Sequence, residues 1–129
     1  MPYVLNFTRP VPVTPGVDYI NPCCLGGDGV FAALLPALRA RYGPLEPDQE
    51  DWGWYLWWRA SDVQLAVDVH THDVDAGEFE IHLTARRRRR WFGTAVVDTP
   101  ELEALRDCVV EALRAWPAAD VRVEHQRAR

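Results

Sequence analysis

Lysine is absent from this 129-residue chain, and all fourteen of its basic side chains are arginines. The nineteen Asp and Glu residues outnumber them and give a formal net charge of -5. Modules that bind nucleic acids usually spread positive charge over a whole face, which an acidic chain does not favour. Arginine and alanine richness without lysine is typical of GC-rich genomes, so we expect a bacterial or phage source.

Cysteine is scarce: Cys23 and Cys24 are adjacent, and Cys108 lies far from them in the sequence. Three cysteines placed in this way do not make a disulfide framework, which favours a reducing compartment. The chain also lacks a basic segment followed by an apolar stretch at its start, and it has no run of about 18 apolar residues. We therefore expect a cytoplasmic protein without a membrane partner.

The hydrophobic pattern, in a chain long enough for one domain, predicts an α+β fold with the element order β-α-β-β-β-α-β. Alternating residues predict strands at Tyr3–Thr8, Asp51–Ala60, Val63–His72 and Glu78 to about Arg87, and a final edge strand over Asp120–His125. Helical spacing predicts one helix over Gly29–Tyr42, with Asp28 as N-cap and a kink or break at Pro36. It predicts a second helix from Pro100 to Trp116, with Thr99 as N-cap and Pro117 as the residue that stops it. We expect a mostly antiparallel sheet with two helices packed on one face.

Strand alternation also divides the side chains of the two middle strands between the faces of the sheet. Aliphatic residues point to the helices, whereas the opposite face carries Asp68, His70, His72, Glu80, His82 and Thr84. A hairpin turn centred on Ala76 would place His70 opposite His82 and His72 opposite Glu80.

This group of histidines suggests a metal site. Two histidines at i and i+2 on one strand and a third on its neighbour, here His70, His72 and His82, can converge on zinc with tetrahedral geometry. The segment "HTHDVD" departs from the HxHxDH pattern of the metallo-β-lactamase superfamily, because its aspartates are one residue off. A zinc-dependent enzyme is therefore the alternative to a solvated polar sheet face.

Tryptophans dominate the segment "WGWYLWW", and alternation assigns to the core Trp52, Trp54, Leu56 and Trp58. The histidine face then gains Tyr55, Trp57 and Arg59. Trp, Tyr and Arg are the residue types enriched at binding hot spots, so these side chains suggest a contact patch. The alternative is that the proline-rich loop 9–22 folds across this face and covers the rings.

The chain contains one run of consecutive arginines, at Arg86, Arg87, Arg88, Arg89 and Arg90. Basic residues beside aromatics, here Trp91 and Phe92, can hold phosphates and stack bases. On a strand, however, the run alternates between two faces, and we expect the strand to end near Arg87. We expect the two aromatics to anchor the following loop on the core and the arginines to be solvated or paired with the acidic segment 46–51. Nucleic-acid binding is therefore the third hypothesis.

The segment "NPCCLGGDG" places two thiols just before a predicted helix. A helix N-terminus lowers a thiol pKa and favours the reactive thiolate. A nucleophile also needs a base, and the sequence assigns none to Cys23 or Cys24. The alternative is a tight glycine-rich loop with small, buried cysteines, and we predict no catalytic residue.

The segments "PGVDYINPCCLGGD" and "EDWGWYLWWR" resemble a family of small bacterial hypothetical proteins with an "EDWGW" motif and no assigned activity. The resemblance implies no role for any residue.

Negative charge, small size and an aromatic-polar face without a catalytic set predict a protein-binding module, of the immunity-protein, antitoxin or phage-inhibitor type. Its predicted binding residues are Tyr55, Trp57, Arg59, His70, His72, Glu80 and His82. We expect another protein as partner and no cofactor, except zinc in the enzyme alternative. The sequence leaves the oligomeric state open, a homodimer included.

Overall fold

The computed structural model describes residues 3–88 and 93–126. They form a seven-stranded antiparallel sheet in the order β2-β3-β4-β5-β1-β7, with β6 paired to β5. The strands are β1 (Tyr3–Thr8), β2 (Asp48–Glu50), β3 (Gly53–Ala60), β4 (Val63–Asp73), β5 (Glu78–Arg88), β6 (Thr94–Val96) and β7 (Ala119–His125). The predicted α+β class and the edge position of the last strand are confirmed. The sequence did not reveal β2 and β6, because three residues are too few for a clear alternation.

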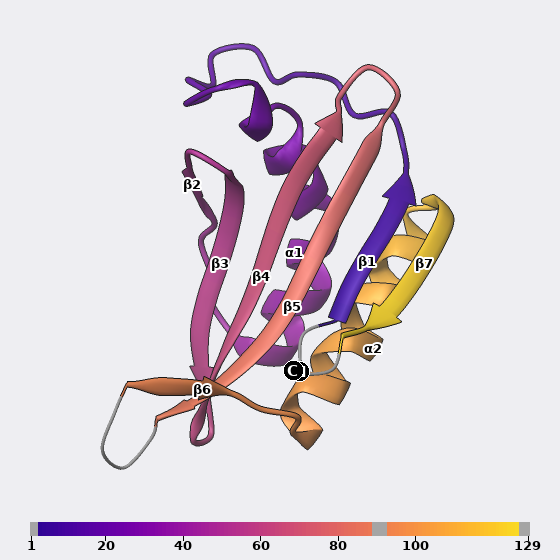
Figure 1. Ribbon diagram of the computed structural model, residues 1–129. Helices are drawn as coiled ribbons and strands as arrows, with labels where there is room; N and C mark the ends of the chain where they lie inside the picture. Colours follow the sequence, from indigo (N-terminus) through magenta and orange to yellow (C-terminus); the bar gives the residue numbers. More distant parts are fainter. Residues whose placement is uncertain (1–2, 89–92, 127–129) are drawn as a thin grey trace.

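Two helices, α1 (Gly27–Tyr42) and α2 (Pro100–Ala115), lie behind the sheet in Figure 1, on the same face, as predicted. α2 begins as expected, because the Thr99 hydroxyl accepts a hydrogen bond from the Leu102 N–H and Pro100 takes the first helical turn. The core between the helices and the sheet includes Phe31, Leu34, Leu38, Leu105, Val109, Val67, Ile81 and Leu83. No helix among the described residues covers the opposite side, which we call the open face (Figure 1).

Helix α1 begins two residues earlier than predicted, and Asp28 is not its N-cap. The Asp28 carboxylate instead accepts hydrogen bonds from the Thr14 and Tyr19 hydroxyls, both at 2.8 Å. These bonds tie the N-terminal loop to the helix, a tertiary role that local capping preferences do not predict. The helix also continues through Pro36 without the predicted break.

The helical segment Pro22–Tyr42 is long and apolar enough, by length and composition, to cross a membrane. Counting uninterrupted apolar residues did not reveal this candidate. It consists of a 3-10 turn, Pro22–Cys24, followed by α1, whose side chains Val30, Phe31, Leu34 and Leu38 are fully or almost fully buried in the core. The core helix of a soluble protein meets the same criterion.

The register of the β4–β5 hairpin differs from the prediction. Asp68 lies opposite His82, and His70 lies opposite Glu80. The turn is centred half a residue before Ala76, since Asp73 pairs with Glu78, and an irregularity between Thr71 and Asp73 then inserts an extra residue; together they shift the pairing. The partner of His70 moves by two positions, so the alternation is preserved and the predicted polar residues still share the open face.

The proline-rich loop between β1 and α1 passes the end of the sheet and packs on its helix side (Figure 1). The Tyr19 ring meets the Trp54 ring edge-on, with centroids 6.4 Å apart, and the Ile20 N–H donates to Gln49 Oε1 at 3.1 Å. Val11 is buried in the core cluster. The alternative in which this loop covers the aromatic patch is therefore wrong.

Candidate functional site

Aromatic and imidazole rings form a continuous row across the open face, from β3 to β5. The ring centroids of Trp57 and Tyr55 are 4.8 Å apart, and those of Tyr55 and Trp52 are 6.1 Å apart. The row continues from Trp52 to His70 at 5.1 Å and from His70 to His82 at 4.6 Å. Rings at these separations stabilise each other's positions. Trp57, at one end of the row, remains 51% exposed.

Trp52 lies in this row and not in the core, where alternation placed it. Strand β3 begins only at Gly53, so Trp52 precedes the strand and its direction is not fixed by the strand's alternation. Within β3 the prediction is correct, because Leu56 is buried and Trp54 and Trp58 pack against the core. The glycine inside "WGW" is the sequence signal that marks this boundary.

Glu80 connects two of the predicted histidines. Its Oε2 lies 2.9 Å from His82 Nε2 and 3.7 Å from His72 Nε2. Burial alone would raise the pKa of Glu80, but the hydrogen bond with His82 and the charges of the three histidines outweigh burial and lower it. With His70 beside His82, the structure brings His70, His72, Glu80 and His82 together on the open face.

These histidines are arranged around a carboxylate rather than around a metal position. His82 uses Nε2 for Glu80, and the turn irregularity displaces His72 from regular pairing. In residues 3–88 and 93–126, no group of at least three His, Cys, Asp or Glu side chains could hold a metal ion. The geometry therefore gives no support to zinc at His70, His72 and His82.

Asp68 holds the exposed Trp57 ring in place. Trp57 Nε1 donates to Asp68 Oδ1 at 2.9 Å, although the residue directly opposite Asp68 on β3 is Tyr55. Burial raises the pKa of Asp68, and the Trp57 hydrogen bond and the charges of His70 and His82 act against that rise. Alternation placed Asp68 on this face, but a diagonal contact of this kind has no signal in residue spacing.

We expect the protein to lose stability in mild acid through His70. Burial lowers the pKa of His70, and the charge of His82 adds to the effect, whereas Asp68, Glu80 and the Trp52 backbone oppose it. A histidine with a lowered folded-state pKa takes up its proton first in the unfolded state. Folding stability therefore falls as the pH drops below the unperturbed value of about 6.5, and it levels off below the folded-state pKa.

Urea unfolding of the wild type and of His70→Gln, between about pH 7.5 and about pH 5, tests this expectation. The wild type should lose more stability than the variant across this range. The lowered pKa of Glu80 contributes a loss only below its ordinary value, and so outside the range. Parallel curves for the two proteins would contradict a contribution from His70.

A groove runs along the open face beside Trp57. Its larger part, about 490 Å³, lies between Trp57 of β3 and Val96 of β6, and its floor is formed by Ala66, Asp68, His82 and Thr84. Its smaller part, about 160 Å³, is lined by Arg59, Asp62, Arg88 and Gly93. The two parts share Gln64, Arg86 and Thr94 and are therefore continuous.

In the described part of the arginine run, neighbouring side chains have different surroundings, as alternation predicts. Arg86 and Arg88 line the groove, whereas Arg87 Nε donates to Asp62 Oδ2 at 2.9 Å. The prediction of a partner in segment 46–51 is wrong for Arg87, because the β3–β4 turn brings Asp62 closer. Strand β5 ends at Arg88, and the predictions for residues 89–92 lie outside the described part of the chain.

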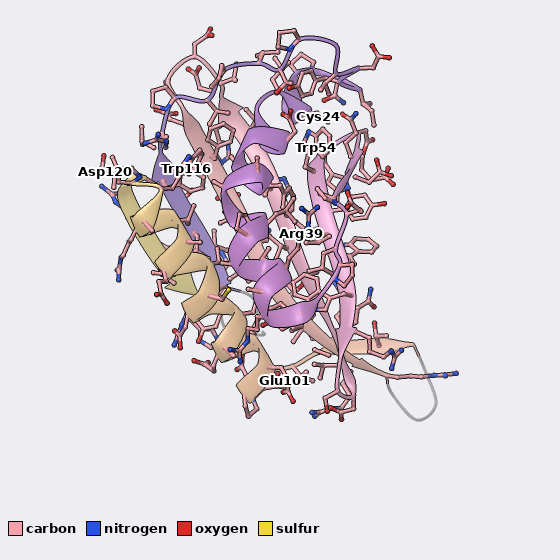
Figure 2. The ribbon with its side chains drawn as sticks, turned by 180° about the vertical axis from the view of Figure 1, so that it is seen from behind. Cys24, Arg39, Trp54, Glu101, Trp116 and Asp120 are labelled. Carbon is pink, nitrogen blue, oxygen red and sulfur yellow. The ribbon has the colours of Figure 1, made fainter. Side chains whose placement is uncertain are left out.

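Cys24 has a structural role. Its thiol donates to the Glu50 carbonyl at 3.0 Å, and its own carbonyl accepts a hydrogen bond from Trp54 Nε1 at 2.8 Å (Figure 2). Burial raises the pKa of this thiol, the opposite of the shift expected at a helix N-terminus. The buried-cysteine alternative is confirmed for Cys24, whereas Cys23 is exposed.

Comparisons with protein-family models, with curated proteins and with solved structures found no match. The resemblance of the "EDWGW" segment to a family of small bacterial proteins stays a prediction. The chemistry and geometry of the open face are therefore the basis for assigning a function.

Proposed function

We propose that this protein is a protein-binding module whose contact surface is the open face. The observation that carries the proposal is the Trp57 ring, which is 51% exposed although the hydrogen bond to Asp68 fixes its orientation. A large side chain that is already ordered loses little conformational entropy when a partner covers it. Tryptophan is also the residue type most typical of binding hot spots.

The rest of the open face supports this assignment. The residues predicted to bind, Tyr55, Trp57, Arg59, His70, His72, Glu80 and His82, share this surface with Trp52, Asp68 and Arg86. A stable interface buries about 800 Å² on each partner, an area that a sheet of this size can provide. We favour a cytoplasmic role of the immunity-protein, antitoxin or phage-inhibitor type, with another protein as the partner.

The proposal is tested by affinity capture from a lysate of the native host cell, in which retention of a partner by the wild type is compared with retention by Trp57→Ala. Ile20→Ala is the matched control, because Ile20 is 54% exposed on the N-terminal loop, away from the open face. The wild type and Ile20→Ala should retain the same partner, and Trp57→Ala should bind it about 30-fold more weakly, the loss expected for a hot spot worth about 2 kcal/mol. Equal retention by all three proteins would contradict the proposal.

A further inference from the structure

Three arginines gather at one end of the groove without forming an ion pair to any described residue: Arg59, Arg86 and Arg88. Arg59 lies opposite Gln64 on β4, and Gln64 lies opposite Arg86 on β5, so the two arginines flank a single glutamine. The carboxylate that lines this end, Asp62, is already bound to Arg87. This end of the groove therefore carries positive charge that is not neutralised by an ion pair.

The spacing of these arginines suits an anionic group. Neighbouring strands are about 4.8 Å apart, which places the backbones of Arg59 and Arg86 about 10 Å from each other. Long arginine side chains can converge from that separation on one carboxylate. Hydrogen bonds between guanidinium and carboxylate are charge-assisted and about twice as strong as neutral ones.

The other end of the groove has the opposite character. Asp68 lines it, and Glu80 lies just beyond with the histidines. Between the two ends, the exposed Trp57 side chain lines the groove together with the small side chains of Ala66 and Thr84. From His82 to Arg88 the groove floor spans about 20 Å, the length of about six extended residues.

This change of charge along the groove favours a peptide over a nucleic acid. A nucleic acid carries a phosphate at every nucleotide, so the carboxylates of Asp68 and Glu80 would oppose it at one end. A peptide can place acidic side chains at the arginine end only. It can then present an aromatic or apolar side chain to Trp57.

We propose that the groove binds an extended acidic segment of the partner protein. The carboxylates of the segment bind Arg59, Arg86 and Arg88, and an aromatic side chain packs on Trp57. This inference rests on the proposed function, because it names the chemistry of the partner at the open face. It assigns to part of the arginine run a role in protein recognition.

The probe is a capped peptide of about six residues, rich in glutamate at one end and with one phenylalanine. It is titrated into ¹⁵N-labelled protein and followed through backbone amide and tryptophan indole signals. The shifts should concentrate at Gln64, Thr84 and Trp57. Arg86→Glu should weaken binding at least tenfold, and added salt should weaken binding to the wild type.

Arg114→Glu is the matched control, because it makes the same change in net charge on α2, away from the open face. It should bind the peptide as the wild type does, and preserved amide spectra show that both variants fold. Equal weakening by the two variants, or no shift with the wild type, would overturn the inference. Tighter binding of an oligodeoxythymidylate of the same length, lost in Arg86→Glu, would also overturn it in favour of a nucleic acid.

The outcomes separate the inference from the proposed function. If Trp57→Ala loses the captured partner while Arg86→Glu keeps it, the open face binds a protein and the acidic-segment inference is wrong. The opposite outcome is that the wild type binds the peptide, Arg86→Glu does not, and Trp57→Ala still captures every protein that the wild type captures from the lysate. In that case the groove recognises acidic peptides and the proposed function is wrong.

Discussion

Replacing Trp54 by alanine should lower the free energy of unfolding by about 3–5 kcal/mol, whereas Trp57→Ala should lower it by only about 1 kcal/mol, the contribution of its hydrogen bond to Asp68. Both residues belong to β3, but they face opposite sides of the sheet. Trp54 packs against the core, contacts Tyr19 edge-on and donates its Nε1–H to the Cys24 carbonyl at 2.8 Å. Figure 2 shows Trp54 and Cys24 together at the start of α1. Trp57 contacts polar side chains on the open face and is half exposed.

Urea unfolding of the two variants beside the wild type measures the contrast. Trp54→Phe is an informative third variant, because it keeps most of the ring packing and removes the donor to Cys24, and it should lose about 1–3 kcal/mol. Equal destabilisation by Trp54→Ala and Trp57→Ala would mean that the Trp57 ring is part of the folded core. In that case the open face would lose its principal contact residue.

The faces of β3 could be predicted because alternation is a steric property of each strand and needs no knowledge of its neighbours. For this reason alternation assigns Trp54 and Trp57 to the correct sides. The prediction failed at Trp52, because the strand starts at Gly53, two residues later than predicted. Alternation therefore predicts side-chain direction only between the true ends of a strand.

Pairing across strands was harder to predict than direction within them. His70, Glu80 and His82 were expected on one surface and lie there, but their partners depend on an irregularity between Thr71 and Asp73. A bulge of one residue depends on how the turn packs, and residue spacing carries little information about it. The sequence thus predicted which residues form the cluster, but not that Glu80 lies at its centre.

The groove had no counterpart in the sequence, because its walls come from distant segments. One wall is Trp57 of β3, and the other is the three-residue strand β6, which pairs with the end of β5 that carries Arg86 and Arg88. A single strand predicts neither wall. Asp28 shows the same limit on a smaller scale, since its contacts with Thr14 and Tyr19 displace it from the capping role that local preference favours.

Gly77→Ala should destabilise the protein by about 2–4 kcal/mol. Gly77 lies in the β4–β5 turn with φ of +72°, a left-handed conformation that costs an L-residue about 1–2 kcal/mol. A Cβ atom at this position would also collide with the backbone of Arg9 and Pro10. The backbone cannot move aside as a flexible side chain can, and the hydrogen bond from the Arg9 N–H to the Gly77 carbonyl, 2.8 Å long, holds it there.

Gly16→Ala separates the two causes, because Gly16 has φ of +83° but no atom within 4 Å of the position that a Cβ would take. This control should lose only the conformational cost, about 1–2 kcal/mol, and thermal or urea unfolding measures the difference. A larger loss at Gly77 means that contact with the hairpin turn positions the N-terminal loop. Equal losses in the two variants would show that the loop moves away from the turn at no cost and is positioned by its other contacts, with Asp28, Gln49 and Trp54.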